Sequence, residues 1–265
     1  MNYFQSIIIS IIEGLTEFLP ISSTAHMRFA NPLIDVSPSP FVDMFEVVIQ
    51  LAAILSVVVI YYKKFFDFSK SVFYIKLIIA VIPALIFGAI LKSHIDEALD
   101  NVTFIAWVML IGGVILLFID KLFTKNIIDD DREITVKRAF AIGGFQVLAI
   151  VFPGLSRSAA TIIGGMSQKL TRRVAAEFSF FLAVPTMFAA SVKSFWDVYK
   201  DHPEVLNKDS YAVLGVGAVV SFIVALFAVK FFITYLQKHG FKAFGVYRIL
   251  LGITMLVLIY LGYIK

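Results

Sequence analysis

The sequence predicts an all-α polytopic membrane protein, with six transmembrane helices and two re-entrant helical hairpins arranged as an inverted repeat. Three observations support this fold class. The 265 residues are 60% hydrophobic and only 16% charged, with a mean hydropathy of +0.90. Apolar runs recur at about the 20 residues that a helix needs to cross the hydrocarbon layer. Two further apolar stretches are interrupted by proline and followed by hydroxyl-rich segments.

The expected spans follow from the positions of these runs. The six long runs lie near residues 44–62, 74–91, 102–119, 174–192, 211–236 and 246–264. Two shorter stretches, 3–20 and 139–152, end at Pro20 and at Pro153-Gly154. Proline has no N–H and interrupts the helical hydrogen-bond ladder. The two shorter stretches are therefore expected to be broken helices that dip into the membrane.

Composition excludes several classes of function. The chain has no cysteine, which excludes disulfides, thiolate catalysis and Cys-ligated zinc. The net charge is +4, and the basic residues are assigned to loops, where they set membrane topology. No nucleic-acid partner is therefore expected. The N-terminus lacks a basic region and carries Glu13 and Glu17, which is not typical of a cleaved signal peptide. No G-x-x-x-x-G-K-[ST] sequence is present, so ATP is not the expected source of phosphate.

A hidden repeat accompanies the two broken segments. When the two prolines are aligned, a serine follows three residues later in both halves, Ser23 and Ser156. We expect one membrane domain, 1–265, built from two copies, 1–119 and 120–265. Each copy holds a broken hairpin and three spans, so the second copy should be inverted relative to the first.

Loop charges predict the orientation. Roughly 15 basic residues are assigned to loops on one side, including Lys63, Lys70 and Arg248, against roughly 6 on the other, including Lys92 and Lys265. The positive-inside rule places the first side in the cytoplasm. The first hairpin then enters from outside and the second from the cytoplasm. In the alternative topology, both broken segments cross the membrane completely, which would scramble the charge asymmetry.

The first broken segment carries two carboxylates. Glu13 and Glu17 are four residues apart, so they share one helix face and repel each other. Ionisable side chains at membrane depth are costly and mark functional sites. A shared proton or a divalent cation, Mg²⁺ or Ca²⁺, would relieve the repulsion, so both glutamates are candidate metal ligands.

Hydroxyl groups follow the first proline. Ser22, Ser23 and Thr24 are suitable N-caps for the next short helix, whose free N–H groups would favour an anion. His26 lies three residues after Ser23, within reach of a base–nucleophile pair if the first turn is helical.

The second broken segment supplies the positive charge. Ser156 or Ser158 is expected to cap its second helix, and Arg157 is the only basic residue in this buried segment. A guanidinium fork matches phosphate oxygens. Thr161 lies one turn further along the same face.

The following spans add polar groups. Glu46 and Gln50 share a helix face and could line the same cavity, and Glu177 could do so or could satisfy a helix dipole. Two inverted hairpins that meet near the midplane would form a pyrophosphate-binding site with hydrolytic groups beside it. The competing class is a transporter or flippase of a phosphorylated lipid or anion, because inverted repeats with broken helices are typical of secondary transporters.

The motifs EGLTEFLPISSTAH, FEVVIQLAAIL, PGLSRSAAT and EFSFFLAVP resemble the undecaprenyl-pyrophosphate phosphatase family associated with bacitracin resistance. The similarity runs from residue 5 to the C-terminus. It implies a multi-pass enzyme of the bacterial plasma membrane that converts undecaprenyl diphosphate to the monophosphate carrier lipid for peptidoglycan synthesis. It also implies a divalent cation, an active site open to the outer face, an association into dimers and bacitracin as a competitor for the lipid substrate.

The resemblance assigns catalytic roles to Glu13, Glu17, Ser23, His26 and Arg157, and phosphate binding to the neighbouring hydroxyls. Two mechanisms remain open. In the first, Ser23 attacks the outer phosphorus, activated by His26 or by the glutamate pair. In the second, water attacks directly with Glu17 as base, and Ser23 only binds.

Overall fold

The computed structural model describes residues 1–67 and 71–264, and helices are the only regular elements of more than one residue in this part of the chain. Lys70 and Lys265, which entered the loop-charge argument, lie outside the described residues. Six helices in this part of the chain are long and apolar enough to span a membrane, which confirms the predicted all-α membrane protein with six spanning helices. They are α3 (Pro40–Ile60), α5 (Ser71–Ile90), α7 (Val102–Leu122), α10 (Arg172–Asp201), α11 (Lys208–His239) and α12 (Lys242–Tyr260).

Shorter helices complete the structure. α1 (Tyr3–Thr16) and α2 (Ser23–Leu33) form the first interrupted pair, and α8 (Val136–Val151) and α9 (Arg157–Ser167) form the second. The remaining α-helices are α4 (Tyr62–Phe65) and α6 (Lys92–Asp100). Both interruptions fall at the prolines, as the sequence predicts.

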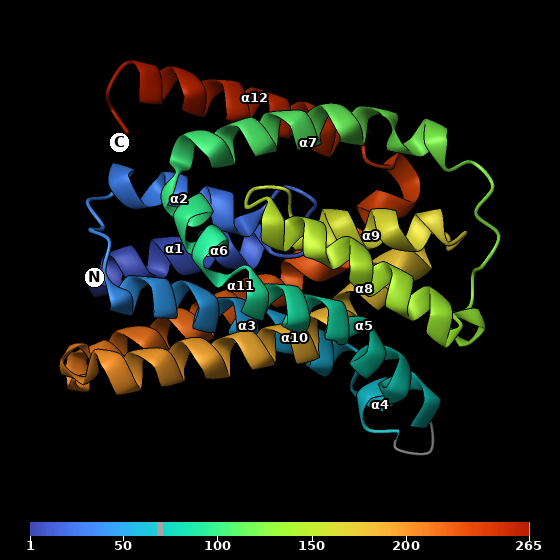
Figure 1. The fold of residues 1–265 in the computed structure, drawn as a ribbon, viewed down its shortest axis with the longest axis horizontal. Helices are drawn as coiled ribbons and strands as arrows, with labels where there is room; N and C mark the ends of the chain where they lie inside the picture. Colours follow the sequence, from blue (N-terminus) through green and yellow to red (C-terminus); the bar gives the residue numbers. More distant parts are fainter. Residues whose placement is uncertain (68–70, 265) are drawn as a thin grey trace.

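The two interrupted pairs approach each other from opposite ends of the helical bundle. In Figure 1, α1 and α2 lie toward the end where the chain begins, whereas α8 and α9 lie toward the opposite end. The tips of both pairs lie in the interior, surrounded by the long helices. Helix contacts follow a matching pattern, because α1 packs on α11 and α8 packs on α5. The topology thus brings residues about 130 positions apart to a common centre.

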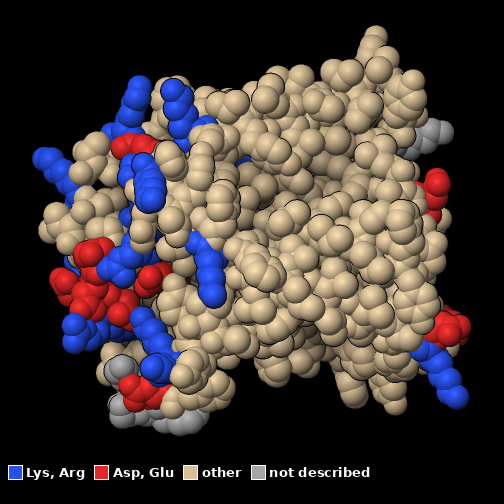
Figure 2. All heavy atoms as spheres, turned by 180° about the vertical axis from the view of Figure 1, so that it is seen from behind, with Lys and Arg blue, Asp and Glu red and all other residues tan. Residues whose placement is uncertain are grey.

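Charged side chains gather at one end of the molecule. Figure 2 shows Lys, Arg, Asp and Glu concentrated there, with a broad band almost free of charge beside it. The loop between α7 and α8 is held at this end, because Lys64 pairs with Asp131 at 2.5 Å and Arg173 pairs with Asp129 at 3.1 Å. Hydrogen bonds from Thr171 and Arg173 hold the pKa of Asp129 below its usual value. The acidic run 129–133 is therefore held in place by ion pairs to neighbouring helices and is not simply a loop exposed to solvent.

Arg248 does not lie in a loop, contrary to the sequence-based assignment. It lies in α12, about two turns after the helix begins, and its side chain is completely buried. Its charge therefore contributes nothing to the loop asymmetry. The remaining basic loops near α4, α7 and α11 still produce the charged end in Figure 2.

Close helix packing depends on glycine at the contact between α5 and α8. A Cβ atom added to Gly143 would collide with the backbone carbonyl of Ala80, whereas one added to Gly144 would meet nothing within 4 Å. We expect Gly143→Ala to lower the thermal unfolding midpoint in detergent, since overpacking costs roughly 1–3 kcal/mol. Gly144→Ala is the matched control and should leave the midpoint unchanged or raise it. Equal midpoints for the two variants would contradict this packing.

Candidate active site

The two helix interruptions have the same backbone construction. Ser22 caps α2 by accepting a hydrogen bond from the N–H of Ala25 at 3.3 Å, and Ser156 caps α9 by accepting one from Ala159 at 3.2 Å. Both caps have positive φ, 68° and 78°. Such a conformation is strained for a non-glycine residue and is found at functional sites.

This construction corrects the register of the repeat. Ser22, and not Ser23, is the counterpart of Ser156. Ser23 and Arg157 are consequently the first residues of the two matching helices, α2 and α9. Each side chain is thus presented at a helix N-terminus, where free N–H groups and the helix dipole favour a bound anion.

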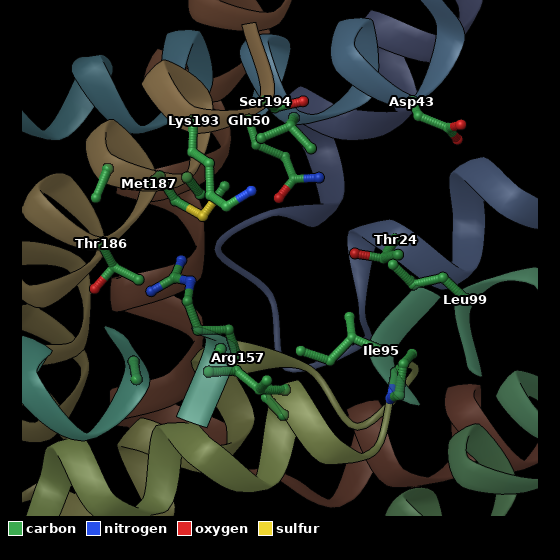
Figure 3. A pocket seen from close by; sticks show the side chains of 18 of the residues that line it. Thr24, Asp43, Gln50, Ile95, Leu99, Arg157, Thr186, Met187, Lys193 and Ser194 are labelled. Carbon is green, nitrogen blue, oxygen red and sulfur yellow. The ribbon is translucent and has the colours of Figure 1, made fainter. Parts of the chain in front are cut away.

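A cavity of about 590 Å³ extends from these helix starts toward the end of the molecule formed by α6 and the start of α3. Figure 3 shows Arg157 directed into it from one side, with Thr186 and Met187 of α10 beside the guanidinium. Much of the wall is apolar, including Leu85 of α5 and Ile95 of α6. The cavity therefore combines a polar floor with walls that suit a hydrocarbon chain.

Glu17 connects the two hairpins at the floor of the cavity. Its Oε2 accepts a hydrogen bond from Ser23 Oγ at 2.6 Å, and its Oε1 pairs with Arg157 Nη2 at 2.8 Å. Arg157 also donates to the backbone carbonyl of Ser179 at 3.3 Å. The Glu17 side chain is 5% exposed and the Arg157 side chain 14% exposed, so this pair is largely shielded from solvent. A hydroxyl, a carboxylate and a guanidinium from the two hairpins are thus in contact.

Glu13 lies behind this group. It is completely buried, and neither of its carboxylate oxygens has a hydrogen-bond partner among the described residues. A buried ionised carboxylate without a partner is strongly disfavoured, so Glu13 requires a proton or a cation. No cluster of three or more His, Cys, Asp or Glu that could hold a metal occurs in residues 1–67 and 71–264. Magnesium commonly takes one or two carboxylates together with substrate phosphates, and the free Glu13 oxygens fit that arrangement.

His26 is not placed against Ser23, contrary to the expected base–nucleophile pair. Its Nδ1 lies 2.7 Å from the backbone carbonyl of Ser22, and its Nε2 lies 2.8 Å from the hydroxyl of Tyr247 on α12. The His26 and Tyr247 rings are also parallel, with centroids 5.6 Å apart. A carbonyl can only accept a hydrogen bond, so Nδ1 carries the ring proton. In a neutral ring, Nε2 then accepts a hydrogen bond from the Tyr247 hydroxyl. In this arrangement Glu17, and not His26, is the base that contacts Ser23.

The remaining predicted residues divide between the cavity and its support. Thr24, Gln50, Ser22 and Ser156 line the cavity. Ser158 instead donates to the backbone carbonyl of Leu19 in the first interruption, at 2.9 Å.

Two further predicted residues have their own partners. Thr161 Oγ1 donates to the Arg157 carbonyl at 2.9 Å and lies 2.5 Å from Ser179 Oγ. Glu46 accepts a hydrogen bond from Asn31 at 2.7 Å and lies 3.5 Å from Arg28 Nε. Both therefore support neighbouring segments.

Sequence reasoning missed several polar residues of the cavity wall, among them Gln146, Thr186 and Lys193. One signal in the repeat could have identified Gln146. It follows the N-cap of α8 at the same sequence distance as Glu13 follows the N-cap of α1. Lys193 was one of the roughly 6 basic residues assigned to loops on the second side, but it belongs to α10, and Figure 3 shows its side chain extending to the cavity. Glu177 lies near the charged end, where it is 3.6 Å from Arg173.

Comparison with known proteins identifies the family. Residues 6–254 match the family model described as "Bacitracin resistance protein BacA". The chain belongs to the BacA family. This confirms the resemblance inferred from the motifs, and the BacA match covers both interruptions and all six long helices except the last residues of α12.

Several curated BacA relatives are similar over nearly the whole chain. An undecaprenyl-diphosphatase of Flavobacterium johnsoniae is 51% identical, covering 97% of this chain and 96% of its own. One from Flavobacterium psychrophilum is 50% identical with the same coverage. Another from Porphyromonas gingivalis is 48% identical, covering 99% of this chain and 98% of its own.

Proposed function

We propose that this BacA-family protein is an undecaprenyl-diphosphatase, an enzyme that hydrolyses undecaprenyl diphosphate to undecaprenyl phosphate and inorganic phosphate. The observation that carries the proposal is the contact of Ser23 and Arg157 with the two oxygens of Glu17, at the polar floor of a cavity whose wall is largely apolar. The names of the relatives support the same activity.

The cavity suits both ends of such a substrate. A diphosphate at the floor would meet the Arg157 guanidinium and the N-termini of α2 and α9, which favour phosphate oxygens. The prenyl chain would lie against the apolar wall formed by α5, α6 and α10. Transfer of a hydrocarbon chain from water to an apolar cavity contributes about 0.8 kcal/mol per CH₂. Transfer from a bilayer contributes little, because lipid tails are already apolar, so the head group must supply the specificity.

The chemical step is a phosphoryl transfer to Ser23. Glu17 accepts the hydroxyl proton as Ser23 Oγ forms a bond to the outer phosphorus, and the bond from that phosphorus to the bridging oxygen breaks. Undecaprenyl phosphate leaves, and water then hydrolyses the phosphoserine and restores the hydroxyl. Arg157 stabilises the charge on the transferring group. Direct attack by water, with Glu17 as base, remains the second route.

A divalent cation, Mg²⁺ or Ca²⁺, is part of the proposal. Glu13, with its two unpartnered oxygens, would hold it, and Glu17 lies one turn further along. When bound, the cation would neutralise charge on the diphosphate. Without the cation, the buried Glu13 carboxyl would instead carry a proton, because no group among the residues that the structure describes compensates its charge.

We infer the cellular setting from the membrane-spanning helices and the distribution of charge. The protein is an integral membrane protein, and we place it in the bacterial plasma membrane with the cavity open to the outer face and the charged end in the cytoplasm. The two interrupted pairs would then be re-entrant from opposite sides. There the enzyme would recycle the carrier lipid of peptidoglycan synthesis, surrounded by membrane lipids and as a homodimer, and bacitracin would compete for its substrate.

The direct test is phosphate release from a C₅₅ or C₁₅ prenyl diphosphate by the purified protein in detergent. Release is expected with Mg²⁺ or Ca²⁺, a fall to background with EDTA, and recovery when the cation is restored. The prenyl monophosphate serves as the matched control and should release none. EDTA-insensitive release would reject the cation at Glu13.

A transporter or flippase is the second candidate, favoured by the two interrupted pairs that enter from opposite ends. Well-folded protein that binds the prenyl diphosphate but releases no phosphate, with or without cations, would support this alternative against the hydrolase.

A further inference from the structure

Arg248 lies where the two helix interruptions meet α7. Its side chain is 0% exposed, and all of its hydrogen bonds are to backbone carbonyls. Nη1 donates to Pro20 at 3.1 Å and Leu155 at 2.6 Å, Nη2 donates to Gly154 at 2.8 Å and Val108 at 3.4 Å, and Nε donates to Met109 at 3.2 Å. One guanidinium thus joins segments that are more than 130 residues apart in the sequence.

Three of these carbonyls need a partner because the helices are interrupted. Backbone carbonyls at a helix break have no intrahelical N–H, and at membrane depth no bulk water replaces it. Pro20 belongs to the first interruption, and Gly154 and Leu155 belong to the second. Arginine offers five N–H donors in a fixed planar fork, so one side chain satisfies both interruptions at once.

The chain also leaves space for this side chain. Gly112 and Gly113 of α7 face Arg248, and a Cβ atom on Gly112 would lie 2.9 Å from its Cζ. A Cβ atom on Gly113 would lie 2.9 Å from the Arg248 Cβ. Any larger residue at Gly112 would therefore displace the guanidinium from its carbonyl partners.

We propose that Arg248 is a positioning residue that holds the two interruptions together and thereby sets the separation between Ser23 and Arg157. Pro20 lies three residues before Ser23, and Leu155 lies two residues before Arg157, so a shift at either carbonyl is passed directly to the reacting groups. No carboxylate among the described residues forms an ion pair with Arg248, so its role is to bind the backbone. The consequence for catalysis rests on the proposed function.

The first test is Arg248→Lys. Lysine keeps the positive charge but replaces the planar fork with a single ammonium, which cannot reach both interruptions with the same geometry. We expect kcat for prenyl diphosphate to fall about 10- to 100-fold, because a displacement of about 1 Å at a catalytic site can cost 100-fold. KM should change less than about 3-fold, because the groups that bind the diphosphate in the ground state are still present. A purely structural role would lower the amount of folded protein and leave kcat per folded molecule unchanged.

Gly112→Ala tests the same contact without removing the arginine. We expect it to lower kcat in the same way as Arg248→Lys, whereas Gly144→Ala, which has no neighbour within 4 Å, should leave kcat unchanged. If folded Arg248→Lys and Gly112→Ala both keep kcat within about 2-fold of the parent protein, the proposal is overturned.

A distance measurement tests the proposal without any activity. Because the chain has no cysteine, spin labels can be placed at Leu33→Cys on α2 and Lys169→Cys just after α9, both exposed positions. Arg248→Lys should shift or broaden the distance distribution between the two labels. An unchanged distribution would overturn the proposal. This readout remains informative if the parent protein releases no phosphate, so failure of the proposed function is distinguishable from failure of this inference.

Discussion

Replacing Arg157 with alanine is expected to lower kcat/KM for prenyl diphosphate by about 100- to 1000-fold, which is the usual cost of one donor that stabilises transition-state charge. Arg157 is a suitable case because its guanidinium contacts Glu17, lines the cavity and is directed into it. Phosphate release by the folded variant, measured across substrate concentrations, separates kcat from KM. Most of the loss should be in kcat, because the charge develops in the transition state.

Loss of the Glu17 ion pair has to be separated from loss of the phosphate contact. Removing Arg157 alone leaves the buried Glu17 carboxylate without its guanidinium partner, and this by itself lowers the stability of the fold. The double variant Glu17→Gln with Arg157→Ala should regain thermal stability without regaining activity. Arg132→Ala is the control, since the Arg132 side chain is 85% exposed and pairs with Asp130 of the same loop. Activity in Arg157→Ala within about 3-fold of the parent would contradict its role at phosphate.

Replacing Ser23 with alanine is expected to reduce kcat to background, at least about 10⁴-fold, if phosphoryl transfer proceeds through serine, since knockouts of a nucleophile in covalent catalysis have effects of this size. The physical reason is the 2.6 Å contact between Ser23 Oγ and the Glu17 carboxylate, which places the base on the hydroxyl proton. Substrate labelled at the outer phosphorus should leave label on the parent protein after rapid acid quench, and none on Ser23→Ala.

The direct-water route makes a different prediction for the same variant. If Ser23 only binds phosphate, its loss should cost about 1–3 kcal/mol, or roughly 5- to 150-fold, and no labelled protein should form. Substantial phosphate release by Ser23→Ala would therefore reject the covalent route. Thermal unfolding of the variant provides the folding control, because Ser23 is not the N-cap of α2; that residue is Ser22.

The membrane architecture could be predicted from the sequence because it depends on composition and spacing. Apolar runs of the required length yielded six spans, and the prolines located both interruptions. The register of the repeat was one residue out, because the second interruption has an extra residue between proline and cap: Gly154 and Leu155, where the first has only Ile21. Proline alignment cannot detect such an insertion.

Side-chain partners within the site were less predictable. Sequence spacing allowed His26 to reach Ser23, but the ring turns toward Tyr247, which is 221 residues away. Arg248 was counted with the loops although it falls near the start of the last apolar run, 246–264, and nothing local indicates that three distant segments supply its acceptors. Such partners depend on how helices from the two halves meet, which one sequence does not contain.

The shared backbone of the two interruptions has an evolutionary consequence. Ser22 and Ser156 hold the same cap conformation, yet the next residue is a serine in one copy and an arginine in the other. Two identical chains related by a two-fold axis would be forced to present the same side chain at both positions. A single polypeptide is free of that constraint, so one position can carry the proposed nucleophile and its counterpart the proposed phosphate-binding guanidinium.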